Sequence, residues 1–265
     1  MELKHVYACE LRDGKPELLP RTSLWEALRL NMMEHMVISL AGGGGKTSSM
    51  YCLADELADR GKRVIVTTST HIQHPGDRQV ILAERAGTVE RFIRNHEKRA
   101  VSDGGWVLVT ARPAAGGKLR GMELMEMEKL AELGDVLLVE ADGARRLPLK
   151  LPRDGEPVHL KSTHAVIGCA GLDCIGRPWR EKCFRYELGY RVFGRQMETE
   201  QITPGHVAEI LTSDKGTRKG TGDAQYRILL NKADDEERLS AAKEVARAMG
   251  GSWAGCCTVT SFSAI

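Results

Sequence analysis

The chain has 265 residues, which is long enough to bury the core of one α/β domain with a modest extension. Its 38 basic and 36 acidic residues leave a net charge of only +2, and both signs are interspersed along the sequence. This balance excludes a strongly basic nucleic-acid-binding protein and a long tail of one charge. We therefore expect neither a nucleic acid nor a membrane as a partner.

The seven cysteines include no C-x-x-C pair, so a disulfide framework is not expected. The N-terminus has no basic region followed by an apolar run, and no stretch approaches about 18 uninterrupted apolar residues. These features predict a cytoplasmic protein.

Residues 1–22 indicate a small N-terminal β-hairpin extension. Two short strand-like segments flank Asp13-Gly14, a pair that readily adopts the positive φ angles of a tight turn. Residues 23–265 are expected to form one P-loop nucleotide-binding domain, beginning with a short helix capped by Ser23.

From residue 36 onward, apolar strand patterns alternate with helical patterns. This alternation predicts an α/β fold, a P-loop NTPase-like, mostly parallel sheet flanked by helices, with a long loop after residue 140. Strands are expected at 36–40, 64–68, 106–110, 136–140, 165–169, 227–230 and 257–260, and helices at 46–60, 89–98, 123–133, after 203 and at 236–249.

The strongest local motif is LAGGGGKT, which ends the first expected strand of the alternation and opens a helix. Glycines let backbone N–H groups turn toward a phosphate, and the helix N-terminus adds a positive dipole. Lys46 is expected to reach the β and γ phosphates, and Thr47 to ligate Mg²⁺. Leu40 stands where the common motif starts with glycine. The nucleotide-binding residues predicted here are Gly42, Gly43, Gly44, Gly45, Lys46, Thr47 and Ser48.

A second motif, Asn231-Lys232-Ala233-Asp234, follows the apolar strand RILL and resembles the N-K-x-D motif of GTPases. There the aspartate accepts hydrogen bonds from guanine N1–H and the exocyclic amine, which adenine cannot supply. Strand ends of a parallel sheet face the ligand crevice. We therefore expect Asn231, Lys232 and Asp234 to contact the base, with GTP or ATP left open.

Two carboxylates, Glu140 and Asp142, follow the buried strand VLLVE. Alternate residues of an extended chain point the same way, so both can address one site. Glu140 is a candidate Mg²⁺ ligand together with Thr47, while the second carboxylate can orient a nucleophile. With Lys46 they form the predicted catalytic group.

Hydroxyl-bearing residues end the second strand of the alternation, in the run TTSTH. Thr68 and Thr70 can contact a γ-phosphate or Mg²⁺, or they can be ordinary β-branched strand residues. His71 is a further candidate, although a solvated histidine is the alternative interpretation.

Taken together, GGGGKTSSM, VIVTTSTHI, LLVEADGARRLPLK, GLDCIGRP, FRYE, ITP and LLNKAD resemble the YqeC family of selenium-dependent hydroxylase accessory proteins. The resemblance runs from about residue 24 to the C-terminus, and EADGARRLPLK is its most specific segment. It implies a role in maturing molybdenum hydroxylases, with such an enzyme or its cofactor-maturation proteins as partner. Besides the glycine-rich loop and the two carboxylates, it points to Thr68, Thr70, His71, Arg145, Arg146, Lys150, Arg185 and Glu187.

The basic residues Arg145, Arg146 and Lys150 follow the carboxylates closely and can bind an anion, or they can form a solvated loop. Among the cysteines, only Cys174 and Cys183 flank a polar loop and are candidates for a reactive thiol. We expect neither to carry selenium, because that chemistry needs an exposed thiol of low pKa.

These observations predict an accessory protein that binds a nucleoside triphosphate with Mg²⁺ and turns it over slowly, if at all. One alternative is an ATP-dependent small-molecule ligase or kinase acting on a cofactor precursor, which should prefer adenine. Another is a nucleotide-gated binding protein without turnover, in which Asp142 would be dispensable.

Overall fold

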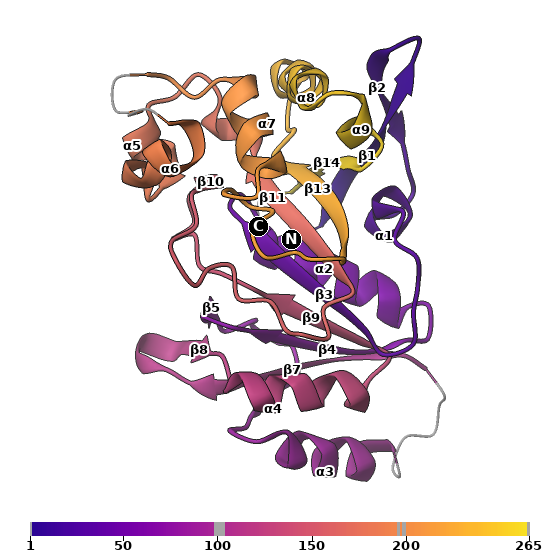
Figure 1. The fold of residues 1–265 in the computed structure, drawn as a ribbon. Helices are drawn as coiled ribbons and strands as arrows, with labels where there is room; N and C mark the ends of the chain where they lie inside the picture. The colour runs from indigo at the N-terminus through magenta and orange to yellow at the C-terminus, as the bar shows by residue number, and fades with distance from the viewer. Residues whose placement is uncertain (1, 98–103, 195–196, 198–199, 264–265) are drawn as a thin grey trace.

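A computed structural model describes residues 2–97, 104–194, 197 and 200–263. The centre of the fold is a large sheet with the strand order β2-β1-β14-β13-β11-β3-β9-β4-β7-β8-β5, and β6 pairs with β7 (Figure 1). The run from β14 to β7 is parallel throughout. This confirms the predicted mostly parallel α/β sheet.

The parallel strands are β3 (Met36–Gly42), β4 (Arg63–Thr68), β6 (Val80–Leu82), β7 (Trp106–Pro113), β9 (Val136–Glu140), β11 (Ala165–Gly171), β13 (Gln225–Asn231) and β14 (Cys257–Phe262). Several lie buried on both faces, which explains their uninterrupted apolar sequences. Short strands β5 (His71–Gln73) and β8 (Lys118–Arg120) add an antiparallel edge beyond β7. The two-residue strands β10 (Leu149–Lys150) and β12 (Cys183–Phe184) form a separate small sheet.

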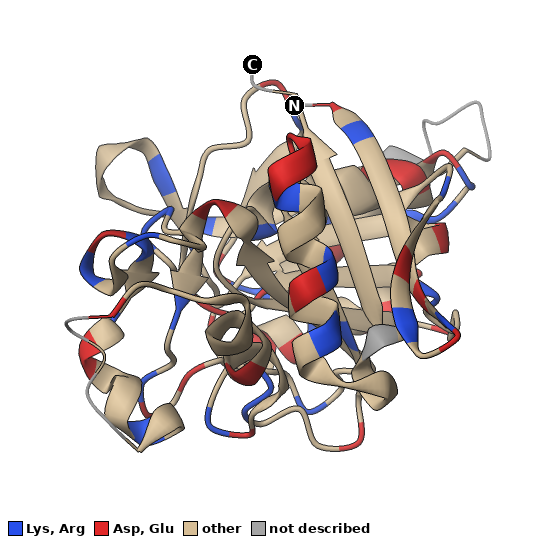
Figure 2. Cartoon of the chain, turned by 90° about the horizontal axis from the view of Figure 1, so that it is seen from above, with Lys and Arg blue, Asp and Glu red and all other residues tan. Residues whose placement is uncertain are grey.

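The predicted N-terminal hairpin is present as β1 (Leu3–Arg12) and β2 (Lys15–Pro20). β1 also pairs antiparallel with β14, so the hairpin continues the main sheet. Figure 2 shows the first and last described residues close together, and the N–H of Ser263 donates to the carbonyl oxygen of Glu2 at 2.8 Å.

Helices cover both faces of the sheet. Successive residues of each strand point to opposite faces, so apolar side chains pack against helices on both sides. Ile38 and Leu40 of β3 face α1 (Leu24–Leu28) and α2 (Lys46–Ala58), whereas Val37 faces the opposite side. On that side α3 (Ala86–Glu97) and α4 (Leu124–Leu130) pack over β4, β7 and β9, and α7 (Pro204–Thr212) and α8 (Glu236–Met249) pack over β11, β13 and β14 (Figure 1).

The remaining helical segments are short: α5 (Trp179–Lys182), α6 (Gly189–Phe193), α9 (Gly251–Ala254) and the 3-10 turns η1 (Ala115–Gly117), η2 (Ala131–Leu133), η3 (Leu172–Cys174) and η4 (Tyr186–Leu188). α2 ends two residues before the expected boundary, in turns that close at Gly61, where φ is 78°. The helix expected to reach residue 98 is described only to Glu97, and its last predicted residue lies outside the described part of the chain.

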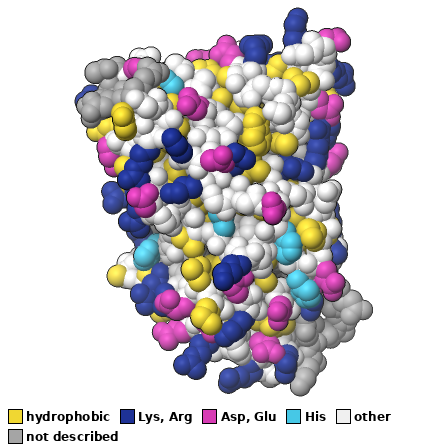
Figure 3. Space-filling model, in the orientation of Figure 1, with side chains coloured by type: hydrophobic (Ala, Val, Ile, Leu, Met, Phe, Trp, Pro, Cys, Tyr) yellow, Lys and Arg dark blue, Asp and Glu magenta, His cyan; other side chains and the backbone are white. Residues whose placement is uncertain are grey.

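The surface carries both charge signs intermixed, as Figures 2 and 3 show. Within the described residues no helix combines the length and apolarity needed to cross a membrane.

Candidate functional site

Lys46 is the first residue of α2 and is only 4% exposed. Its Nζ donates to the carbonyl oxygen of Gly42 at 2.6 Å and lies 3.2 Å from Oδ1 of Asp142 and 3.9 Å from Oε1 of Glu140. Burial lowers the pKa of Lys46, but the two carboxylates outweigh burial and raise it. The predicted catalytic group therefore converges on a lysine that remains a buried cation.

Thr47 and Glu140 meet at the start of the same helix. Thr47 Oγ1 donates to Oε2 of Glu140 at 2.6 Å. Burial raises the pKa of Glu140, although Lys46 and Thr47 act in the opposite direction. A hydroxyl beside a carboxylate supplies the oxygen ligands that Mg²⁺ prefers. Among the described residues no group of three or more His, Cys, Asp or Glu side chains is arranged to hold a metal, so a cation here would need ligand or water oxygens as well.

The first half of the glycine-rich loop is tied to neighbouring backbone. Gly43 N–H donates to the carbonyl oxygen of Cys169 at 2.9 Å, and Gly44 N–H donates to that of Leu147 at 3.0 Å. A phosphate that used the Gly44 N–H would have to replace Leu147. The segment after the two carboxylates therefore lies directly against the loop.

The second half of the glycine-rich loop leads into the N-terminus of α2. Gly45 is the N-cap residue at φ 105° and has no side chain to cap the helix. The N–H groups of Lys46, Thr47 and Ser48 belong to the first turn, where no intrahelical acceptor exists. Together with the helix dipole, they form an arrangement that favours an anion.

Asn231 joins this loop to the N-K-x-D segment. Its Nδ2 donates to the carbonyl oxygen of Gly44 at 2.9 Å, and its Oδ1 accepts from Thr260 Oγ1 at 3.1 Å and from Lys232 N–H at 2.7 Å. A Cβ at Gly45 would lie 2.0 Å from Asn231 Nδ2. Asn231, at the end of β13, is 4% exposed, and its hydrogen bonds link β13 to β14 and to the glycine-rich loop.

Asp234 lies nearer the surface, with its side chain 44% exposed. Its Oδ1 accepts from Ser261 Oγ at 2.7 Å, and its Oδ2 accepts from Arg238 at 2.7 Å. Lys232, in the left-handed region at φ 64°, pairs with Asp173 at 2.9 Å. The segment thus lies at the carboxyl ends of β13 and β14, at the same edge of the sheet as the glycine-rich loop.

A row of alternating charges leads away from the loop. Asp142 accepts from Gly42 N–H with both oxygens at 3.2 Å, and its Oδ2 lies 2.9 Å from Lys150 Nζ. Lys150, 1% exposed, lies 2.7 Å from Oε2 of Glu156, which also pairs with Arg185. We call Lys46, Asp142, Lys150, Glu156 and Arg185 the charge chain.

The carboxylate of Glu156 is strongly stabilised within the charge chain. Burial raises its pKa, but hydrogen bonds from Arg185 and Lys150 outweigh burial and lower the pKa to about 2. Lys150, expected with Arg145 and Arg146 either to bind an anion or to lie in a solvated loop, is instead buried between the carboxylates of Asp142 and Glu156.

Arg145 and Arg146 do lie at the surface. Both adopt left-handed backbone conformations, at φ 50° and 64°, which are uncommon for residues with a side chain. The guanidinium of Arg145 lies 5.1 Å from the ring centre of Phe184, and that of Arg185 lies 4.5 Å from the same ring. The ring of Phe184 therefore brings Arg145 and Arg185 together. Arg185 is also linked to the glycine-rich loop through the charge chain.

The remaining predicted residues divide into two groups. Thr68 is buried, and its Oγ1 donates to the carbonyl oxygen of Glu140 at 3.2 Å. Oγ1 of Thr70 lies 3.5 Å from Oγ1 of Thr68. His71, on β5, and Glu187, in η4, are exposed, and within the described part of the chain neither side chain is hydrogen-bonded to the glycine-rich loop. The threonines of the hydroxyl run therefore hydrogen-bond near Glu140, whereas His71 is exposed on β5.

Cys174 and Cys183 are buried, at 0% and 1% exposure. Burial raises the pKa of the Cys174 thiol to about 12 and that of Cys183 well above its usual value. Neither meets the requirement for an exposed thiolate.

Sequence patterns did not single out three residues that shape the site: Glu156, Leu147 and Thr217. Leu147 acts through its carbonyl oxygen, and Thr217 has its methyl group 3.1 Å from where a Cβ of Gly42 would lie. Only Glu156 had a usable signal, because Lys150 stands in the apolar run LPLKLP and a lysine buried there needs a carboxylate partner.

The YqeC family model, described as "YqeC protein", matches residues 38–187, more than half of the chain. The chain belongs to the YqeC family. The YqeC match covers the glycine-rich loop, both carboxylates and the whole charge chain, and it ends before Asn231. A relative from Escherichia coli (strain K12), described as "Uncharacterized protein YqeC", is 33% identical over 142 residues. That alignment covers 53% of each protein, so the chain matches about half the length of this YqeC relative.

Proposed function

We propose that this YqeC-family protein binds a nucleoside triphosphate together with Mg²⁺ at Gly42–Thr47. The observation that carries the proposal is the buried Lys46 between Gly42, Asp142 and Glu140, at the N-terminus of α2. A lysine kept protonated at the end of a glycine-rich loop is suited to neutralise phosphate oxygens.

The residues around this lysine have distinct proposed roles. Thr47 and Glu140, already in contact, would hold Mg²⁺, which neutralises phosphate charge when bound. Asp142, which accepts from Gly42 N–H and lies against Lys46, would orient the lysine and the loop. Partly exposed Asp234 would read the base, with Asn231 holding its segment against the loop. This arrangement favours GTP over ATP.

Within the cell, the proposed role is that of an accessory protein that matures selenium-dependent molybdenum hydroxylases, with slow nucleotide turnover. The support is family membership, together with a buried lysine at a glycine-rich loop and a hydroxyl–carboxylate pair whose chemistry suits phosphate and Mg²⁺. Slow turnover is expected because an NTPase site often needs a partner to complete its transition-state contacts.

The test is titration calorimetry of GTP and ATP with Mg²⁺, using wild type, Lys46→Ala, Thr47→Ala and Asp234→Ala. Lys46→Ala is expected to weaken binding of both nucleotides at least tenfold, since a charge-assisted contact contributes about 1.5–3 kcal/mol. Asp234→Ala should reduce GTP affinity and leave ATP affinity unchanged.

The exposed Lys243→Ala on α8 is the matched control, and circular dichroism checks that each variant is folded. Because Lys46 is buried, Thr47→Ala provides a milder change at the same site. The absence of nucleotide binding by folded wild-type protein would overturn the proposal. ATP preference unaffected by Asp234→Ala would overturn base recognition and favour the ligase or kinase alternative.

A further inference from the structure

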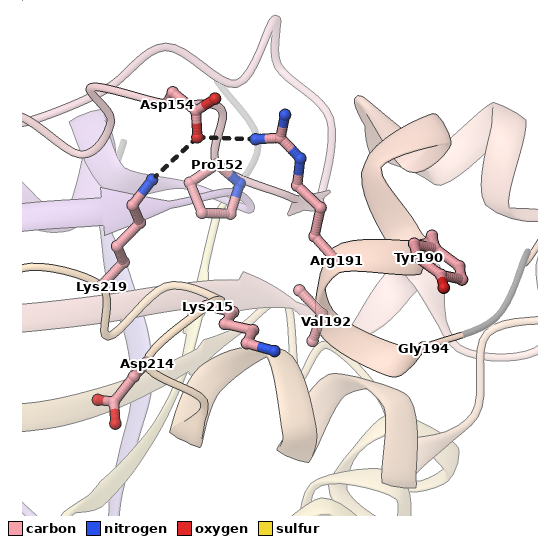
Figure 4. Close-up of a pocket in the computed structure, with 9 residues that line it drawn as sticks. All are labelled: Pro152, Asp154, Tyr190, Arg191, Val192, Gly194, Asp214, Lys215 and Lys219. Carbon is pink, nitrogen blue, oxygen red and sulfur yellow. Dashed lines mark hydrogen bonds and ion pairs between the residues drawn. The ribbon is translucent and has the colours of Figure 1, made fainter.

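A hollow of about 580 Å³ lies between residues 152–154, 190–194 and 214–219, and no residue of the glycine-rich loop lines it (Figure 4). One wall comes from the segment after β10, the second from α6, and the third from the segment after α7. Three separate parts of the chain therefore meet around one space that the nucleotide site does not use.

Cations outnumber available carboxylates in this hollow. Arg191 lies 2.8 Å and Lys219 lies 3.8 Å from the same oxygen, Oδ1 of Asp154 (Figure 4). The other acidic residue in the lining, Asp214, is paired with Arg218. Lys215 makes no ion pair with any residue in the described ranges. An anionic group entering the hollow would find Lys215 unpaired and two further cations sharing one oxygen.

The lining also offers surface for the uncharged part of a small molecule. Tyr190 is 67% exposed, and Val192 and Pro152 contribute aliphatic surface next to the charged groups. A few polar groups beside apolar surface are typical of small-molecule sites.

Each wall is connected to the glycine-rich loop. Asp154 is two residues from Glu156 of the charge chain, and Arg185 of the same chain precedes α6. Thr217, between Lys215 and Lys219, is 2% exposed and packs against Gly42. A ligand in the hollow would therefore touch one segment that contacts the loop through Thr217 and two segments that lead to Glu156 and Arg185 of the charge chain.

We propose that this hollow is a separate site that binds a small molecule carrying a carboxylate or phosphate group. The site stands on its own geometry and does not depend on the proposed function.

Benzoate and phenyl phosphate are the probes, each combining a flat apolar body with one of the two anionic groups. Their affinities are measured by ligand-observed NMR titration of the full chain, with and without saturating GTP and Mg²⁺. Lys215→Ala and Arg191→Ala are each expected to weaken binding about tenfold, since each removes a charge-assisted hydrogen bond. Asp154→Asn should tighten binding severalfold, because it removes the charge that pairs with Arg191, whereas Lys219 keeps its 3.1 Å hydrogen bond to the carbonyl oxygen of Arg153. Lys243→Ala is the control and should leave affinity unchanged.

Binding of either probe with these opposite effects supports the proposal, and the tighter probe identifies the preferred anionic group. The proposal is overturned if neither probe binds, if the variants have no effect, or if GTP displaces the probe competitively. If the probe binds as expected but no nucleotide binds, the proposed function fails while the anion site stands.

Discussion

The Nζ atom of Lys150 lies 2.9 Å from Oδ2 of Asp142, and both side chains are only 1% exposed. The same ammonium group lies 2.7 Å from Glu156. One buried lysine therefore balances two buried carboxylates, one at the glycine-rich loop and one in the segment that follows β10. Removing the lysine would take one counter-charge from each carboxylate, in a place that water reaches poorly, and leave Asp142 with Lys46 and Glu156 with Arg185.

We therefore predict that Lys150→Met lowers the free energy of unfolding by about 3–5 kcal/mol, the usual cost of breaking a buried ion pair. Urea denaturation monitored by circular dichroism measures this change. Arg94→Ala, which removes an exposed pair with Glu90 on α3, is the control and should change stability little. A loss no larger than that of the control would show that the buried contact contributes nothing.

Glu156 should make stability depend on acidity. Its folded-state pKa is about 2 against an ordinary value of 4.5, so its stabilising contribution is complete above pH 4.5 and is lost as pH falls toward 2. After allowance for solvent screening, we expect Glu156→Gln to cost about 1–2 kcal/mol at pH 7, with the difference from wild type shrinking between pH 5 and 2. Unfolding curves at several pH values test this. The exposed Glu187→Gln serves for comparison, and a constant difference across the range would contradict the prediction.

Gly45 should tolerate no side chain. A Cβ would lie 2.0 Å from Asn231 Nδ2, and φ is 105°. Gly45→Ala is expected to destabilise the protein by about 2–4 kcal/mol through overpacking and backbone strain, and to weaken nucleotide binding. Gly87→Ala in α3, where a Cβ meets nothing within 4 Å, is the matched control and should stabilise the protein by about 0.5–1 kcal/mol. Thermal unfolding and nucleotide titration of both variants test this prediction. Equal changes in stability for Gly45→Ala and Gly87→Ala would contradict the expected clash with Asn231.

Asp234→Asn should change which base is preferred. Xanthine carries an oxygen where guanine carries its exocyclic amine, so a donor amide at this position suits xanthosine triphosphate better than GTP. We expect GTP affinity to fall about tenfold or more and xanthosine triphosphate affinity to rise, as measured by calorimetry. Ser261→Ala removes one hydrogen bond to Asp234 without changing its charge, and it should retain the GTP preference. An Asp234→Asn protein with unchanged preference would place the base elsewhere.

The main sheet could be predicted from the sequence because its strands are buried on both faces and interrupted by helices of regular period. The same regularity placed Lys46, Glu140 and Asn231 at one edge, since parallel strands share the direction in which they end. These residues lie close in space because each lies at or just after the carboxyl end of a parallel strand, which a short motif in the sequence already marks.

The contacts made by loops could not be predicted in this way. Glu156 pairs with Lys150 and Arg185, and it lies in a loop whose sequence has no hydrophobic periodicity. These pairs depend on how the loop folds back in space, which residue spacing does not reveal. The short strands β10 and β12 were missed for the same reason, because two residues are too few to show alternation. Leu147 contributes a backbone oxygen, which any residue there would supply.

The hydrogen bond from Gly44 N–H to the carbonyl oxygen of Leu147 has a kinetic consequence. A phosphate oxygen can take that N–H only after the segment carrying Arg145 and Arg146 has moved aside. Binding of a triphosphate would then proceed through an encounter at the open turn of α2, followed by a slower rearrangement. The observed association rate would level off at high nucleotide concentration, at a value set by the opening of this one backbone contact.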